Sequence, residues 1–250
     1  MRVALIVNKV TGRLKTDLSY MEELGRKAAQ SRVDLILYPE AAPTGLINND
    51  DPGHDLPLGT PIPGPITERL AKLARQAKAY LASGILERDG NCLYDSAIIL
   101  DPVGKIVLHY RRIQPQWHGR KADPHVYRQG EEVVAALTPL GKLTVLICGD
   151  LFDDQIIARL RRLGPDYLLF PFSVDFDDGS FDQRRWDQEE QPAYAARAAV
   201  AGCTTLMTNL LVDVAVADCP SYGGAMVVSP QGEVLARKPL GQPGVLIADV

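Results

Sequence analysis

Cys148 is the residue in this chain best suited to nucleophilic chemistry. It follows a short apolar, β-branched run at residues 143–147, typical of a buried strand, and precedes Gly149 and a predicted helix over residues 153–163. A cysteine at such a strand-to-helix turn lies beside the positive end of a helix dipole, which favours the thiolate. A thiolate attacks carbonyl carbon atoms and forms a covalent intermediate. Because free cysteines are often buried, simple packing is the alternative explanation.

Glu40 is the first candidate for moving protons to and from such a thiol. Residues 33–38 form a predicted strand that ends at Pro39, so Glu40 stands just beyond its carboxyl end, where open α/β sheets place their chemistry. A glutamate whose pKa is raised by burial can take the thiol proton and return it to a leaving amine. A helix cap or a solvated side chain would explain this glutamate equally well.

A positively charged segment, residues 111–129, follows a predicted strand at residues 105–110. Its first arginines are Arg111 and Arg112, and it also carries two histidines and a tryptophan. A fixed cation beside a nucleophile stabilises the negative oxygen of a tetrahedral intermediate. A solvated basic loop is the alternative, and it is a common one.

Strands and helices are predicted to alternate from one end of the chain to the other. The predicted strands are residues 2–7, 33–38, 80–86, 93–100, 105–110, 143–147, 167–171, 204–208, 225–229, 233–237 and 245–250, and the predicted helices are 17–30, 66–79, 153–163 and 188–202. Irregular loops separate them at residues 41–65, 111–129 and 173–186. Since no repeat or linker interrupts this order, we expect one α/β domain over residues 1–250.

Composition narrows the class of protein. The 250 residues are 46% hydrophobic and 23% charged, which is typical of a globular chain with an ample core. A net charge of -4 gives no indication of nucleic acid or an anionic membrane as a partner. The longest apolar runs stay well short of the roughly 18 residues that span a membrane.

The cysteines and histidines indicate neither a disulfide framework nor a metal site. The cysteines are Cys92, Cys148, Cys203 and Cys219, which form no CxxC pair, and the histidines are scattered. The apolar start, residues 1–7, is too short for a signal peptide. We therefore expect a reduced, cytoplasmic protein without a metal.

Several short motifs occur in an order and at a spacing that resemble the nitrilase, or carbon–nitrogen hydrolase, family. They are Pro39-Glu40, Tyr94-Asp95-Ser96-Ala97, Tyr110-Arg111-Arg112, Gly141-Lys142, Cys148-Gly149-Asp150, Arg197-Ala198, Asn209, Tyr222-Gly223-Gly224-Ala225 and Ser229-Pro230-Gln231-Gly232. Each motif is weak alone, but the ordered set covers almost the whole chain.

This resemblance implies a four-layer α-β-β-α sandwich of two mixed β-sheets that forms a homodimer or a larger homo-oligomer through a helical face. It implies hydrolysis of a non-peptide C–N bond, most often in a small amide, through a thioester acyl-enzyme and without a metal or organic cofactor. The catalytic glutamate, lysine and cysteine of the family correspond to Glu40, Arg112 and Cys148.

The chain departs from the family pattern at two positions. Arg112 stands where the family has its lysine, and an arginine keeps its charge and effectively never gives up its proton. The family's second glutamate has no counterpart, because Asp123 is the only acid between Arg112 and Gly130. Possible substitutes for these two roles are Lys105, Lys121, His118, His125 and Asp123. A second hypothesis is therefore a catalytically silent relative that acts as a binding or assembly protein.

Other residues are predicted to contact the substrate or a second subunit. The amide N–H of Gly149 is a candidate oxyanion donor. The candidates for a pocket lining are Tyr127, Phe172, Asp175, Phe176 and Trp186, with loop anchoring as the alternative. The alanine-rich helix at residues 188–202 is the expected dimer contact, although its alanines also suit packing against a sheet.

Overall fold

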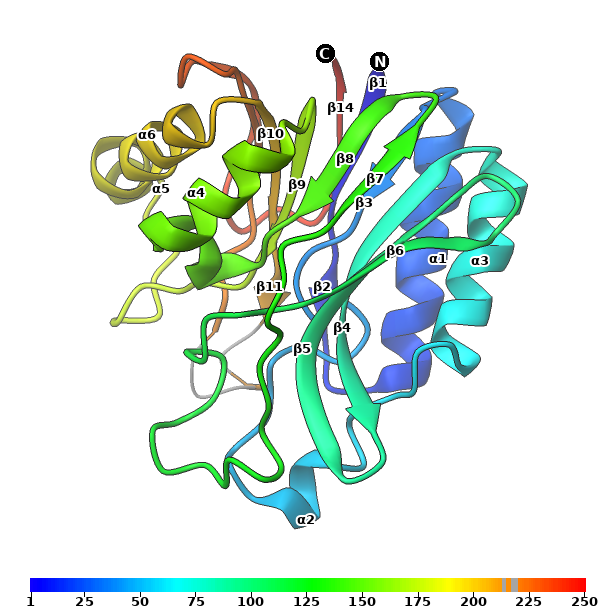
Figure 1. Ribbon diagram of the computed structural model, residues 1–250, viewed down its shortest axis with the longest axis vertical. Helices are drawn as coiled ribbons and strands as arrows, with labels where there is room; N and C mark the ends of the chain where they lie inside the picture. Colours follow the sequence, from blue (N-terminus) through cyan, green and yellow to red (C-terminus); the bar gives the residue numbers. More distant parts are fainter. Residues whose placement is uncertain (213–214, 217–219) are drawn as a thin grey trace.

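The fold is built on two six-stranded sheets that face each other (Figure 1). It is seen in a computed structural model that describes residues 1–212, 215–216 and 220–250. The first sheet has the order β14 (Gly244–Asp249), β1 (Arg2–Val7), β3 (Leu35–Leu37), β4 (Tyr80–Asp89), β5 (Cys92–Leu100) and β6 (Ile106–Arg111). The second has the order β13 (Val234–Lys238), β12 (Ala225–Val228), β10 (Thr204–Asn209), β9 (Tyr167–Phe172), β8 (Gly141–Val145) and β7 (Ala135–Thr138).

Both sheets mix parallel and antiparallel neighbours. In the first, β1 runs parallel to β3 and antiparallel to β14; in the second, β10 runs parallel to β9 and antiparallel to β12. Just after β1 and β10, the chain forms two short strands, β2 (Lys9–Val10) and β11 (Leu211–Val212), which pair in parallel. The chain ends lie together, with the Met1 amino group 2.6 Å from the carbonyl oxygen of Val250.

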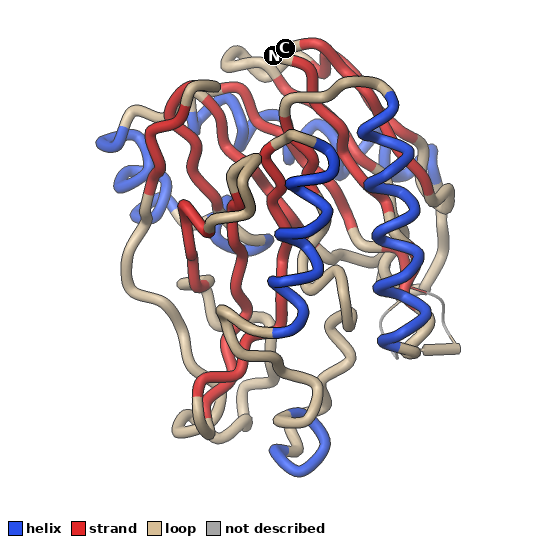
Figure 2. Tube along the Cα trace, turned by 90° about the vertical axis from the view of Figure 1, so that its right-hand side faces the viewer, coloured by secondary structure: helices blue, strands red, loops and turns tan. Residues whose placement is uncertain are grey.

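Helices cover the outer face of each sheet. The long helices α1 (Leu14–Gln30) and α3 (Pro65–Ala77) lie side by side against the first sheet (Figure 2). On the far side, α4 (Asp154–Leu163) and α6 (Gln191–Ala201) lie against the second sheet (Figure 1). The layers therefore run α-β-β-α, and the expected sandwich of two mixed sheets is confirmed.

The alternation of side chains along a strand explains why β1 is apolar from Val3 to Val7. Leu5 and its neighbours of the same parity point between the two sheets, whereas Ala4 and Ile6 point at α1 and α3. Both faces of this strand are fully buried. A strand buried on both faces reads as a continuous apolar run, which is why residues 2–7 were predictable.

The structure adds elements that the sequence pattern did not predict. They are β2, β7, β11, the short helices α2 (Pro52–Asp55) and α5 (Gln183–Arg185), a 3₁₀ turn (Cys148–Phe152) and a π turn (Trp186–Glu190). The predicted helix over residues 188–202 is correspondingly two pieces, because α6 begins only at Gln191 with Pro192 in its first turn.

The cysteines Cys92, Cys148 and Cys203 are free thiols, while the fourth, Cys219, lies outside the described residues. Across residues 1–212, 215–216 and 220–250, no group of three or more histidine, cysteine, aspartate or glutamate side chains is placed to hold a metal ion. None of the helices in these same ranges is long and apolar enough to cross a membrane.

Candidate active site

Cys148 lies in a tight turn directly after the apolar run that follows β8. Its φ of 47° is in the left-handed region, which a residue with a Cβ rarely adopts and which costs on the order of 1–3 kcal/mol. The buried residues Leu146 and Ile147 fix the incoming backbone. The sulfur lies 3.7 Å from the carbonyl oxygen of Ser173, just beyond the end of β9. The turn thus presents Cys148 at the strand ends, as predicted.

The prediction that Cys148 lies beside the N-terminus of an α-helix is wrong. The α-helix that follows begins at Asp154, six residues further on, and Asp153 caps it by accepting from the N–H groups of Gln155 at 2.8 Å and Ile156 at 3.1 Å. Cys148 opens only the short 3₁₀ turn. The N-terminus of α4 is therefore already occupied by its own capping carboxylate.

Glu40 follows β3 and is completely buried. Its Oε1 accepts a 2.8 Å hydrogen bond from Nη1 of Arg112. Gly84 on β4 permits this turn, since a Cβ there would lie 2.5 Å from the Cα of Glu40. Burial, and then the neighbouring charge of Cys148, raise the pKa of Glu40 well above its usual range. A carboxyl group in this state is suited to accept and return a proton.

Arg112, and not Arg111, faces the site because side chains alternate along β6. Tyr110 and Arg112 share one parity and point between the sheets, whereas Arg111 points outward and pairs with Glu87 at 2.6 Å. Arg112 is only 3% exposed. Burial alone would lower its pKa, but the acidic groups of Cys148 and Glu40 outweigh burial and raise it. The guanidinium is a permanent buried cation.

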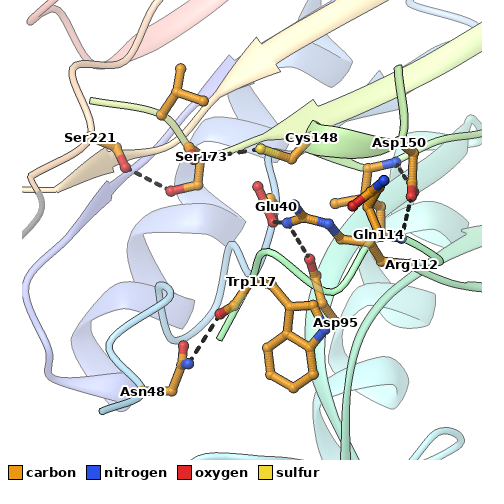
Figure 3. Close-up of polar contacts among 12 residues, drawn as sticks. Glu40, Asn48, Asp95, Arg112, Gln114, Trp117, Cys148, Asp150, Ser173 and Ser221 are labelled. Carbon is orange, nitrogen blue, oxygen red and sulfur yellow. Dashed lines mark hydrogen bonds and ion pairs between the residues drawn. The ribbon is translucent and has the colours of Figure 1, made fainter. Parts of the chain in front are cut away.

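Asp95 is a site residue that sequence reasoning missed. It lies on β5, entirely buried, and its Oδ2 accepts from Nη1 of Arg112 at 3.2 Å. It shares parity with Ala97, which points between the sheets, so the strand pattern could have placed it inward. Figure 3 shows the carboxyl groups of Asp95 and Glu40 on the same guanidinium.

Asp150 is a second missed residue, two positions after Cys148. Its carboxylate accepts four hydrogen bonds, from the N–H groups of Ile113 at 3.2 Å, Gln114 at 2.8 Å and Ile147 at 3.1 Å and from the hydroxyl of Tyr110 at 2.7 Å. Burial raises the pKa of Asp150, and these donors counteract the rise. Every donor belongs to the segment that carries Arg112 or to the turn that carries Cys148. Asp150 therefore fixes the two relative to each other.

A cavity of about 360 Å³ opens beside Cys148. Its lining comes from the loops after β3, β6, β8 and β9: Leu46, Asn48, Asn49, Asp50, Arg112, Gln116, Trp117, His118, Gly119, Cys148 and Ser173. Asn48 donates a 3.1 Å hydrogen bond to the carbonyl of Trp117, which joins two of these loops (Figure 3). The wall combines polar side chains with apolar surface and suits a small ligand that carries polar groups.

Gly149 lies against the guanidinium of Arg112. A Cβ on Gly149 would be 2.9 Å from Nη2, so only glycine allows this approach. Arg112 Nη2 therefore lies close to Gly149, the residue that follows Cys148. Donors in this arrangement can act on a single oxygen atom.

The other predicted substrate contacts are placed elsewhere. Tyr127 is 1% exposed, and its hydroxyl donates to Asp55 at 2.5 Å. Phe172 is 1% exposed and stacks on Phe170 in the core. Asp175 is half-buried and outside the cavity lining. Phe176 and Trp186 pack against Tyr222, which fits the loop-anchoring alternative.

Among the alternatives for the missing glutamate and lysine, only His118 lines the cavity. Its Nδ1 lies 2.9 Å from the Gly119 carbonyl oxygen, and its Nε2 lies 2.8 Å from Nε2 of Gln129. Lys105, Lys121, Asp123 and His125 are exposed and do not contribute to the lining. Asp123 instead accepts the backbone N–H of His125 at 2.9 Å.

Comparisons with known proteins agree with this architecture. Residues 2–250 match the sequence model of the family described as Carbon-nitrogen hydrolase. The deaminated glutathione amidase of Dictyostelium discoideum is 27% identical over 242 residues, 92% of this chain and 80% of that protein. Nitrilase 2 of Arabidopsis thaliana is 27% identical over 209 residues, 76% of this chain and 57% of that protein.

A solved structure gives the same fold at lower identity. It is a mutant amidase from Nesterenkonia sp. AN1 with the acetamide moiety of fluoroacetamide added covalently at its active-site cysteine. The two structures superpose with a TM-score of 0.82 and 20% identity, covering 100% of this chain and 90% of that chain.

Proposed function

The chain belongs to the carbon-nitrogen hydrolase family, and from that premise we propose that it hydrolyses a small amide through a thioester on Cys148. The observation that carries the proposal is the convergence of Glu40, Arg112 and Cys148 (Figure 3). They come from three separate loops at one end of the sheets, and Arg112 and Cys148 line the same cavity.

In the first half-reaction Cys148 attacks the amide carbonyl. Its thiol proton passes to Glu40 as the S–C bond forms, and the carbonyl oxygen becomes negative. Arg112 Nη2 and the N–H of Gly149, the residue after Cys148, supply the positive ends that stabilise this oxygen; Nη2 lying close to Gly149 supports this pairing. As the C–N bond breaks, Glu40 returns the proton to nitrogen, so ammonia or an amine leaves and a thioester remains.

In the second half-reaction Glu40 takes a proton from water. The resulting hydroxide attacks the thioester carbonyl, and the same two donors stabilise the new tetrahedral oxygen. The C–S bond then breaks, the sulfur regains a proton from Glu40, and a carboxylic acid is released. Arg112 stays charged throughout because an arginine does not give up its proton. No step of this route calls on a metal or an organic cofactor.

The size of the cavity favours a small substrate. About 360 Å³ is at the lower end of the range for small-molecule sites, and the lining offers amide, carboxylate and indole groups. The amide of a small, polar acid fits this wall. A catalytically silent binding protein, the alternative, would have no need to hold a thiol in a left-handed turn beside a buried cation.

We also propose that residues 1–250 act as one catalytic domain. Both sheets contribute to the site, since Arg112 follows β6 of the first sheet and Cys148 follows β8 of the second. A homodimer and a cytoplasmic location remain predictions from the sequence.

An ammonia- and amine-release screen over small aliphatic and polar amides tests this function. The expected result is release from at least one amide by the unmodified protein and none by Cys148→Ala. Cys203→Ala is the matched control, because Cys203 is a buried thiol outside the cavity. Equal release by the unmodified protein and Cys148→Ala, or no release from any amide, would reject it.

A further inference from the structure

Two buried carboxyl groups share one nitrogen of one cation in this site. Glu40 and Asp95 are 0% and 1% exposed, and both accept from Nη1 of Arg112, at 2.8 Å and 3.2 Å. Arg112 itself is 3% exposed. Two negative charges beside one positive charge in a buried site leave an uncompensated charge, which is costly. One proton on the carboxyl pair removes that cost.

The remaining oxygens of the pair also indicate a proton. Within the described residues, Glu40 Oε2 and Asp95 Oδ1 are buried and have no hydrogen-bond partner. Two ionised carboxylates offer only acceptors, whereas a protonated carboxyl group offers a donor to its neighbour. Buried polar atoms are normally paired, so a proton carried by the pair explains these two orphaned oxygens.

The pKa shifts of Glu40 and Asp95 also favour a proton on the pair. Burial is the main cause that raises the pKa of Glu40 and that of Asp95 above their usual ranges. The interaction between the two neighbouring carboxyl groups further raises the pKa of Glu40 and lowers that of Asp95, so the proton is held more strongly on Glu40. Coupled carboxyls of this kind titrate as a pair.

Other ionisable groups face the pair and belong to the same electrostatic unit. They are Arg112 and Tyr110 from the β6 segment, Cys148 and Asp150 from the turn after β8, and Tyr194 from α6. Asp150 has four donors of its own, and Arg112 is the one cation among these groups. None of them supplies the missing second positive charge.

We propose that Asp95 is a fourth residue of the site, which shares a single proton with Glu40, so that the pair stores and returns the proton of Cys148. Before attack the pair carries one negative charge opposite Arg112, and the thiol is neutral. As the S–C bond forms, the thiol proton joins the pair, which becomes neutral while the negative charge moves to the sulfur and then to the carbonyl oxygen.

The summed charge of the pair, Arg112 and the reacting thiol and carbonyl stays at zero through this step, and one proton then passes from the pair to the leaving nitrogen. The family pattern expects a second carboxyl group between Arg112 and Gly130. In this chain Asp95 on β5 provides that second carboxyl group instead. Asp95 acts through Glu40 and is a positioning residue. This use of the pair rests on the proposed function, but the shared proton itself does not.

The pH dependence of folding tests the shared proton without any substrate. A group whose pKa is higher in the folded protein than in the unfolded chain stabilises the fold. That stabilisation is complete at pH values below the unfolded-state pKa and is lost as pH rises towards the folded-state pKa. Because the folded pair binds one proton that the unfolded chain releases, the folded-to-unfolded ratio falls by up to an extra tenfold per pH unit, from the ordinary carboxyl range upwards until the folded pair itself titrates.

Urea unfolding of the full chain at several pH values measures this slope. In Asp95→Asn and in Glu40→Gln the folded-to-unfolded ratio is expected not to show this extra fall with pH. The single carboxylate that remains is neutralised by Arg112, so the fold has no need to bind a proton there. Asp150 keeps its four hydrogen-bond donors in every variant, so its own contribution to the slope is expected to change little. Asp17→Asn is the control and should keep the original slope, because Asp17 is a buried aspartate that bonds Thr11 and Arg13 outside the cavity.

Infrared spectroscopy is the second measurement and does not depend on how stable a variant is. The unmodified protein is expected to show one protonated carboxyl band at neutral pH, absent from both Asp95→Asn and Glu40→Gln. Equal pH slopes in all four proteins, or no such band in the unmodified protein, would overturn the proposal. An amide screen that fails while both results hold would reject the amide hydrolase and leave the pair standing.

Discussion

The hydroxyl of Tyr110 donates a 2.7 Å hydrogen bond to the carboxylate of Asp150 across the interface between the two sheets. Tyr110 lies on β6, two residues before Arg112, and Asp150 lies two residues after Cys148. The same carboxylate binds the backbone N–H of Ile147. One buried acid thus links β6 and the segment after it, which carries the cation, to the turn that carries the thiol.

Removing that hydroxyl should loosen the link. Tyr110→Phe keeps the ring, which is 1% exposed, but deletes a hydrogen bond to a buried carboxylate. We expect a loss of about 1–3 kcal/mol in the free energy of unfolding, measured with urea. Tyr94→Phe is the control with no expected change, because the face of the Tyr94 ring makes the contact with Arg111. Equal stability of both variants and the unmodified protein would show that the bond contributes nothing.

Glu87 should govern part of the acid stability. Burial would raise its pKa, but hydrogen bonds from His109, Arg111 and Ser96 lower it to about 2 from an ordinary value of 4.5. A lowered pKa adds stability that is present above the unfolded pKa and is lost as pH falls towards the folded pKa. The native state should therefore lose about 3 kcal/mol between about pH 4.5 and 2 through this residue.

Glu87→Gln tests this by urea unfolding at a series of acidic pH values. The variant is expected to be less stable at neutral pH and to approach the unmodified protein near pH 2. Glu233→Gln removes an exposed carboxylate on the second sheet's side of the molecule and should follow the unmodified protein throughout. A constant gap between the Glu87→Gln and unmodified curves down to pH 2 would contradict the prediction.

Most strands and helices of this fold could be predicted from the sequence because the patterns that indicate them involve neighbouring residues. The apolar run of β1 and the helical spacing of α1 are patterns of neighbouring residues, and both elements lie where they were expected. Glu40, Arg112 and Cys148 each follow a predicted strand, but it was the family resemblance that selected them as a set. Their placement at one end of the sheets follows the rule that functional side chains gather at strand ends.

Asp95 and Asp150 were missed because their roles depend on distant segments. Nothing near Asp95 in the sequence shows that Arg112, 17 residues away, turns its guanidinium onto it. Tyr127 illustrates the converse error. An aromatic residue in a charged loop resembled a pocket wall, yet its hydroxyl bonds Asp55, 72 residues away, and its ring is buried.

Arg112 should be replaceable by lysine but not by alanine. Arg112→Ala leaves Glu40 and Asp95 buried without a cation and removes an oxyanion donor, so turnover should fall about 100- to 1000-fold. Arg112→Lys keeps the charge and should retain or improve turnover. Alkylation of Cys148 by iodoacetamide at neutral pH, which needs no substrate, should be slowed by alanine and not by lysine. Unchanged alkylation and turnover in Arg112→Ala would assign the cation's role to another residue.

The predicted homodimer can be tested on α6. One face of this helix, with Tyr194, Ala195 and Ala198, packs within the chain, whereas Val200 is 43% exposed on another face. Light scattering at micromolar concentration should show a dimer that Val200→Glu converts to a monomer. Val103→Glu, at a 72% exposed turn of the first sheet, should leave the dimer intact. A monomeric unmodified protein would reject the prediction.

The central claim is a covalent thioester on Cys148, and intact-protein mass spectrometry of acid-quenched reactions tests it most directly. With an amide that the protein cleaves, the account predicts an added mass equal to the acyl group during turnover, located on the peptide that contains Cys148. Hydroxylamine should remove the added mass, and Cys148→Ser should release no amine. Turnover without any acyl adduct, or an adduct on Cys92 or Cys203, would contradict the account.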